Sequence, residues 1–170
     1  ERLWGIMNYR YIPVYPEDRA EIVEGIIGED MDDATMWARS LARAEADAQA
    51  RPEQAFSWFV LGSNLAAQGR YEEAVTAYER AREIGLPHRT HWYTFGPYQA
   101  YYETGRYQEL IALSDANLAG TQGVEEIYYW RGLALRELGD HAAALQAFQS
   151  ALALRQDFPE AHEALASVAE

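Results

Sequence analysis

Internal repetition restricts the fold of this chain more than any other feature. The stretch from Trp58 to Ala81 superimposes on the stretch from Tyr128 to Ala151, and a looser copy runs from Tyr98 to Asn117. The interval from Gly62 to Tyr98 is 36 residues, and that from Tyr98 to Gly132 is 34. A unit of this length cannot bury its apolar face alone, so neighbouring copies are expected to stack.

Within each copy, small and large apolar residues alternate at helical spacing. The small residues, at Gly62, Ala74 and Ala81, recur where two antiparallel helices must approach closely. Glycine recurs just after the first helix of each copy, where a left-handed backbone suits it. The large residues fill the space between the helices; they are Trp58, Leu61, Leu65 and Tyr78. The pattern therefore predicts helix hairpins.

We expect helices at residues 55–68, 71–84, 91–104, 107–119, 124–138 and 141–154, and a capping helix at 159–169. Pro87 and Pro159 fall in the expected connections. Pro97 instead falls inside the helix predicted at 91–104, where it would kink that helix or move its start downstream. Upstream, residues 30–50 read as a helix with Trp37, Leu41, Ala44 and Ala48 on one face.

The repeated pattern resembles the tetratricopeptide repeat, through Trp58-x-x-Leu61-Gly62-x-x-Leu65 and the matching run from Tyr128 to Leu135. The resemblance implies an all-α, right-handed superhelical solenoid of three to four antiparallel helix pairs with a C-terminal cap. We expect repeats at about 55–88, 91–124 and 125–158, a degenerate pair at 17–54, and an extended segment at 1–16. A protein–protein interaction scaffold is the implied function.

Residues 9–15 are aromatic and β-branched and lack a helical period, which is a strand signal. The stretch from Trp4 to about Gly28 resembles the junction between a bacterial bacteriocin-processing, papain-like cysteine peptidase domain and following repeats. This resemblance implies that Trp4 to Tyr15 is the last strand of such a domain. It implies an accessory region of a larger bacterial protein, in the cytoplasm or outside it. Separately, no run approaches the roughly 20 apolar residues that span a bilayer, so we expect this chain to be soluble. No catalytic residue transfers, because the nucleophile is a cysteine and the chain has none.

In the tetratricopeptide family, ligands usually lie along the concave face made by the first helix of each pair. Transferring the positions of that face gives a set of mostly aromatic residues, at Phe56, Phe59, Ser63, Trp92, Phe95, Gln99, Tyr102, Tyr129, Leu133 and Arg136. Exposed aromatic residues with an arginine are typical anchors of a peptide groove. Members that clamp acidic termini use several basic residues, whereas only Arg136 is available here. An apolar or basic partner is expected.

The same aromatic residues are also compatible with a chain that has no ligand groove. The upstream segment could fold back over them, a second copy could cover them in a homodimer, or they could be solvent-exposed. The alternative functions are accordingly a structural spacer or dimerisation module without a ligand groove, and a non-catalytic fragment of a cysteine peptidase.

Charge and composition argue against several further functions. A net charge of -13 and a pI near 4.7 disfavour nucleic acid and anionic membranes as partners. His88 and His91 have the spacing of a metal pair, but a site needs a third ligand. The nearest acids in the sequence are ordinary surface helix residues, at Glu79, Glu83 and Glu103, so no metal is expected. No phosphate loop or seryl elbow occurs. We expect no cofactor and no enzymatic activity.

Overall fold

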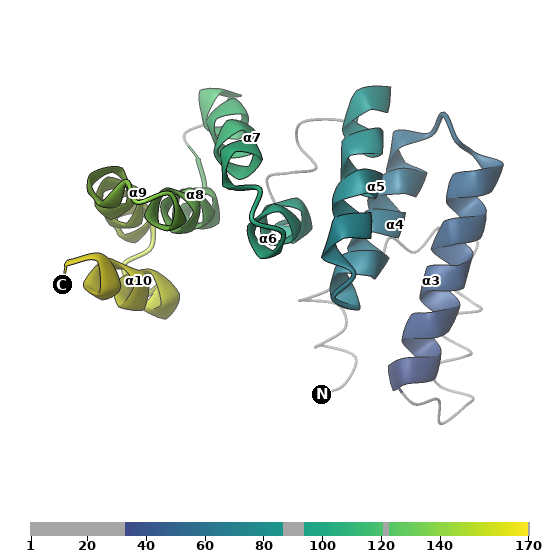
Figure 1. The fold of residues 1–170 in the computed structure, drawn as a ribbon, viewed down its shortest axis with the longest axis horizontal. Helices are drawn as coiled ribbons and strands as arrows, with labels where there is room; N and C mark the ends of the chain where they lie inside the picture. The colour runs from purple at the N-terminus through teal and green to yellow at the C-terminus, as the bar shows by residue number, and fades with distance from the viewer. Residues whose placement is uncertain (1–32, 87–93, 121–122, 170) are drawn as a thin grey trace. The chain divides into compact units, whose positions relative to one another are not determined.

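The computed structural model describes residues 33–86, 94–120 and 123–169, and this part of the chain is helical throughout, without strands (Figure 1). The elements are α3 (Asp33–Ala50), α4 (Ala55–Ala67), α5 (Tyr71–Ile84), α6 (Gly96–Glu103), α7 (Tyr107–Gly120), α8 (Glu125–Glu137), α9 (His141–Leu154) and α10 (Pro159–Ala169). The all-α prediction is confirmed. The predicted strand at 9–15, residues 17–32 of the predicted degenerate pair, and the pair His88 and His91 lie outside the described residues.

The chain divides into two compact units, residues 1–86 and 87–170. In the first unit, α4 and α5 form an antiparallel hairpin, and α3 packs on α4. The predicted apolar face of α3 is buried at Leu41, Ala44 and Ala48. Between the same two helices, the Ser40 hydroxyl donates to the side-chain oxygen of Asn64 at 2.6 Å.

Glycine allows the two helices of a hairpin to approach closely. A Cβ atom on Gly62 of α4 would lie 2.7 Å from the ring of Tyr78 on α5. The equivalent Cβ on Gly132 of α8 would lie 2.5 Å from the ring of Phe148 on α9. Both distances are too short for a contact between carbon atoms, so each hairpin requires glycine at this position. The predicted turn conformation is also present, since Gly69 has a φ of +74°.

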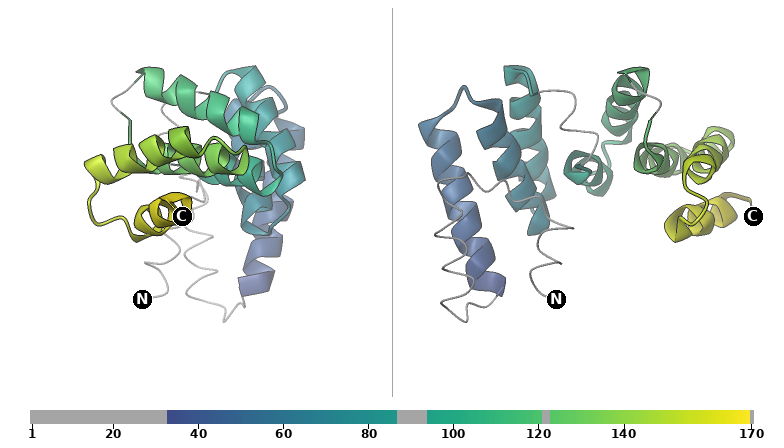
Figure 2. Two further views of the ribbon diagram at one scale, coloured as in Figure 1. Left: turned by 60° about the vertical axis from the view of Figure 1, so that its left-hand side comes forward. Right: turned by 180° about the vertical axis from the view of Figure 1, so that it is seen from behind.

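In the second unit, α6 pairs with α7, α8 pairs with α9, and α10 packs on α8 and α9 (Figure 2). Phe148 is fully buried between α8, α9 and α10, beside Ala144, Leu133 and Ala164. Because α10 buries its alanines against the last hairpin, it covers an apolar face that would otherwise be exposed. The helix predicted at 159–169 is therefore confirmed.

Helix α6 starts later than predicted. The sequence favoured a helix from residue 91, whereas α6 begins at Gly96 and Thr94 and Phe95 precede it. Pro97 lies in its first turn, where the missing amide hydrogen has no intrahelical partner to lose. Pro97 thus starts the helix rather than kinking it.

Polar contacts add to the packing between helices of the second unit. The buried Asn117 of α7 donates through Nδ2 to the hydroxyl of Tyr98 on α6 at 2.5 Å. Arg131 of α8, where the repeat pattern prefers leucine, donates through Nε to Asp115 of α7 at 2.8 Å. An ion pair therefore replaces an apolar contact at this junction.

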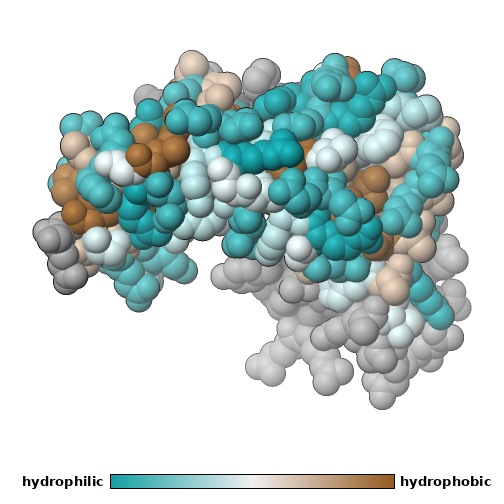
Figure 3. Space-filling view, viewed as in Figure 1, coloured by the Kyte–Doolittle hydropathy of each residue, from teal (hydrophilic) through white to brown (hydrophobic). Residues whose placement is uncertain are grey.

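Hydrophobic residues on the visible face of the molecule form separate small patches among hydrophilic ones (Figure 3). Within the described ranges, no helix has both the length and the apolar character needed to cross a membrane.

Candidate functional site

Four of the residues predicted for the concave face meet in one open hollow of about 400 Å³ in the second unit. We call it the inner pocket. Helices α6, α8 and α10 supply its walls, and each is the first helix of its repeat or, for α10, the cap. Its lining residues are Tyr102, Glu103, Tyr129, Trp130, Leu133, Arg136, Glu160, Glu163, Ala164 and Ser167.

The central wall of the inner pocket is one face of α8. Tyr129, Leu133 and Arg136 are separated by four and three residues, so the helix places them on one side. Leu133 is 7% exposed; most of it belongs to the core, and the remainder contributes to the pocket. Its packing against the core fixes the position of the central wall.

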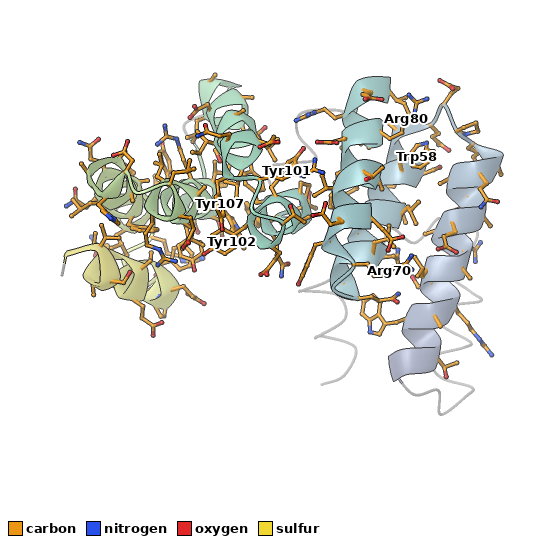
Figure 4. The ribbon with its side chains drawn as sticks, viewed as in Figure 1. Trp58, Arg70, Arg80, Tyr101, Tyr102 and Tyr107 are labelled. Atoms are coloured by element: carbon orange, nitrogen blue, oxygen red, sulfur yellow. The ribbon has the colours of Figure 1, made fainter. Side chains whose placement is uncertain are left out.

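Aromatic rings line the pocket on either side of this wall. The ring of Tyr129 packs against Phe158 at 5.1 Å and against Trp130 at 5.8 Å, between centroids. Trp130 in turn meets the ring of Tyr102 edge-on at 5.9 Å. Figure 4 shows Tyr102 beside Tyr107, where α6 and α7 meet. These contacts hold the rings in place, and Tyr102, Tyr129 and Trp130 stay only partly buried.

Arg136 is engaged by its own chain. Its Nη2 donates to Glu137 at 3.0 Å and to the Tyr102 hydroxyl at 3.4 Å, and its Nη1 donates to Ser167 at 3.2 Å. Burial opposes the charge of Arg136, but the bonds to Glu137 and Tyr102 outweigh it and raise its pKa. Arg136 therefore ties α6, α8 and α10 together.

Carboxylates dominate the charge of the inner pocket. Glu103, Glu160 and Glu163 are exposed residues of its lining, against one guanidinium. Burial, and then the negative charge of Glu160, raise the pKa of the Tyr129 hydroxyl. The glutamates of α10 thus act electrostatically on the aromatic wall.

Phe59 was predicted to be an exposed anchor, and the structure shows that this is wrong. It is 1% exposed, and its ring lies 5.4 Å from that of Tyr78 and 6.3 Å from that of Phe56. Phe59 therefore fills the interior of the first hairpin, beside the Tyr78 ring that packs closely on Gly62. Phe56 is only partly buried.

None of the other described residues predicted for the groove lines the inner pocket. Ser63 donates to the backbone oxygen of Phe59 at 3.0 Å and accepts from the Tyr78 hydroxyl at 3.3 Å. Phe95 packs on Tyr98 at 5.8 Å just before α6, and Gln99 is partly buried on α6. Trp92 lies outside the described residues.

Sequence reasoning missed the contribution of α10, although a signal for it existed. Adding the repeat interval of 34 to Glu126, Tyr129 and Leu133 reaches Glu160, Glu163 and Ser167. All three line the inner pocket. The polar pattern of 159–169 indicates a cap. The positions of its residues also match those of α8, the first helix of the preceding repeat, at the repeat interval. Trp130 and Glu103 had no comparable signal.

A smaller hollow of about 260 Å³ lies in the first unit, beside Trp58 and Arg70 (Figure 4). None of the predicted groove residues lines it, and Arg70 is paired with Glu73 at 2.6 Å. Among the described residues, no group of three or more histidine, cysteine or acidic side chains could hold a metal ion.

Comparison with known proteins agrees with this geometry. Residues 55–85 match the family described as tetratricopeptide repeat, and residues 132–169 match the family described as TPR repeat. These two stretches of the chain are therefore tetratricopeptide repeats. The two matches fall on the hairpin of α4 and α5 and on the region from α8 to α10. No curated protein sequence matches the chain.

A solved structure with a similar fold is MamA, residues 41 to the end, from Desulfovibrio magneticus RS-1. The TM-score is 0.72 at 17% sequence identity, and the alignment covers 88% of this chain and 80% of that one. At this identity the likeness concerns the fold. Tetratricopeptide repeats bind protein partners and are generally non-catalytic, so the repeats support an interaction scaffold. Nothing in the comparisons supports the predicted resemblance to a peptidase junction.

Proposed function

We propose that this chain is a docking scaffold and that its second unit binds an extended segment of a partner protein along the inner faces of α6, α8 and α10. The observation that carries the proposal is the meeting of Tyr102, Tyr129, Leu133 and Arg136 in the inner pocket. These residues come from the first helices of successive repeats.

The character of the pocket supports a polypeptide ligand of apolar or basic composition. Rigid aromatic side chains offer contact area at a small loss of side-chain entropy, and such residues dominate binding energy at protein interfaces. Acidic segments fit poorly because Glu103, Glu160 and Glu163 would repel them, and Arg136 is already bonded to Glu137. Nucleic acid fits poorly for the same reason.

The proposal includes no catalytic step for this chain. An enzyme site needs a nucleophile with a base, or paired carboxylates in a cleft. The pocket carboxylates are instead exposed residues on an open surface. We further propose, from the resemblance of Trp4 to Gly28 alone, that the parent protein carries a cysteine peptidase domain that the repeats serve. The full-length gene sequence tests this point.

The docking proposal is tested with a substitution that fills the pocket and leaves the buried core residues unchanged. A displayed library of random 12-residue peptides is selected on the 170-residue chain, and the selected peptides are measured by calorimetry. Ser167→Trp places a large ring at the pocket wall, whereas Ala166→Trp places it on an exposed neighbouring position of α10 that does not line the pocket.

We expect Ser167→Trp to weaken the selected peptides at least about tenfold, because steric occupation removes the aromatic contact area. Ala166→Trp should leave their affinity unchanged. Equal binding to both variants, or a selection that yields no peptide, would contradict the proposal.

Sedimentation velocity addresses a second copy as the occupant. The docking proposal expects a monomer at micromolar concentrations for the wild type and for both variants. A dimer that Ser167→Trp alone dissociates would assign the pocket to self-association instead.

A further inference from the structure

Three aromatic rings that line the inner pocket, those of Tyr102, Tyr129 and Trp130, are steeply inclined to one another where they touch. The rings of Tyr129 and Trp130 are inclined by 65°, and those of Trp130 and Tyr102 by 61°. Edge-on packing of this kind directs ring faces in different directions, and an aromatic face attracts a cation through its negative quadrupole. The walls are therefore suited to a cationic group as well as to an apolar one.

The charges around these walls favour a cation over a neutral group. Glu160 and Glu163 are three residues apart on α10, so they project on one side of the helix. Glu103 faces the same pocket from α6. The carboxylates thus come from two helices, α6 and α10. A positive charge placed between these helices would be attracted by the carboxylates of both.

Arg136, the one positive group in the pocket lining, does not cancel the attraction of the glutamates for a cationic ligand. Arg136 directs its two terminal nitrogens to Glu137, Tyr102 and Ser167. A ligand anion would have to compete with these intramolecular bonds, whereas a ligand cation would meet the glutamates directly. The arrangement thus differs from an anion-binding clamp.

We propose that the inner pocket receives one cationic side chain of the bound segment, an arginine or a lysine. This inference rests on the docking function proposed above and specifies its ligand. The cation would lie between the aromatic wall of α8 and the glutamates of α10, with Glu103 opposite. The volume of about 400 Å³ accommodates one long side chain and part of its backbone.

The test uses two peptides that differ in charge alone. They are acetyl-Leu-Ala-Arg-Ala-Leu-amide and the same peptide with citrulline, which keeps the shape of arginine and lacks its charge. Binding to the full chain is followed by the indole N–H signal of Trp130 in ¹⁵N-correlated NMR spectra, assigned with Trp130→Phe. We expect the arginine peptide to bind at least about fivefold tighter, with an advantage that shrinks as salt rises.

Matched charge variants locate the effect. Glu160→Gln with Glu163→Gln should abolish the advantage of arginine over citrulline. Glu109→Gln with Asp157→Asn removes the same total charge at exposed positions that do not line the pocket and should preserve the advantage.

Three outcomes would overturn the inference. The first is equal affinity for the two peptides, and the second is an arginine preference that both double variants reduce alike. The third is that neither peptide shifts the Trp130 signal. The docking function would still be supported in each case if Ser167→Trp weakened the binding of the library-selected peptides. The cation inference can therefore be wrong while the docking proposal holds.

Discussion

The hydroxyl of Tyr102 on α6 donates to the carboxylate of Glu137 on α8 at 3.0 Å, and Arg136 extends this link to Ser167 on α10. The three helices that line the inner pocket are therefore joined by side chains on the pocket side as well as by the core behind it. A site held in shape before binding loses less entropy when a partner arrives. We therefore expect the inner pocket to keep its shape without a ligand.

Replacing Arg136 distinguishes a pocket that binds a cation from one that binds an anion. We expect Arg136→Gln to raise the affinity for the arginine peptide about threefold, because it removes a like charge from the pocket. Calorimetry measures the change. The control is Arg131→Gln, which removes an equal charge from α8 where Arg131 pairs with Asp115 outside the pocket. A loss of affinity specific to Arg136→Gln would show that the bonds of the guanidinium to Glu137, Tyr102 and Ser167 matter more to binding than the removal of its charge.

Truncating Phe59 should destabilise the first unit strongly. Phe59→Ala leaves a cavity beside Tyr78 and is expected to lower the free energy of unfolding by about 3–5 kcal/mol. Phe56→Ala, at a partly buried position, should have a smaller effect. Urea denaturation followed by circular dichroism measures both. A negligible effect of Phe59→Ala would show that this ring is not part of the core.

Adding a side chain at Gly62 should disrupt the hairpin of α4 and α5. A Cβ there would already lie 2.7 Å from the Tyr78 ring, so Gly62→Leu should lower the free energy of unfolding by about 1–3 kcal/mol or more. Ala67→Leu introduces the same side chain at an exposed position of α4 and should be nearly neutral. The two melting temperatures give the comparison, and equal values would argue against close packing at Gly62.

Tyr98 makes stability sensitive to alkaline pH. Burial raises its pKa to about 12, more than the hydrogen bond from Asn117 lowers it. In the unfolded chain the hydroxyl loses its proton near pH 10, whereas in the folded protein it keeps the proton up to about pH 12. The unfolded state then binds fewer protons, so the contribution of Tyr98 to stability is complete below pH 10 and is lost as the pH rises toward 12.

The corresponding experiment is the pH dependence of urea unfolding for the wild type and Tyr98→Phe. Between pH 10 and 12, the decline in unfolding free energy should be shallower in the variant by up to about 1.4 kcal/mol per pH unit. Loss of the Asn117 bond should also lower its stability at neutral pH by about 1 kcal/mol. Parallel pH profiles would show that Tyr98 titrates alike in both states.

The repeat pattern predicted most of the helical framework, because small residues at fixed intervals have a direct packing meaning. Gly62 and Gly132 meet Tyr78 and Phe148 as a close helix approach requires. The start of α6 could not be fixed, since Pro97 is compatible with either a kink or a first turn. Only the path of the preceding backbone decides between them.

The pocket was only partly predictable. Tyr102, Tyr129, Leu133 and Arg136 are predicted from the repeat register to share one face, and all four line the inner pocket. That they bind a partner stays a prediction. The register failed at Phe59, because equivalent positions can turn toward either the groove or the hairpin interior, and a large aromatic ring gains more from burial against Tyr78. The ties between Arg136 and its neighbours depend on three helices and have no signature in one sequence.

The central claim is that a partner segment lies along the inner faces of α6, α8 and α10. Amide chemical-shift mapping on the ¹⁵N-labelled chain, titrated with the tightest library-selected peptide, tests it most directly. We predict that the largest shifts fall around Tyr102, Trp130, Arg136 and Glu163. Shifts concentrated on α7 and α9, or in the first unit, would contradict the account.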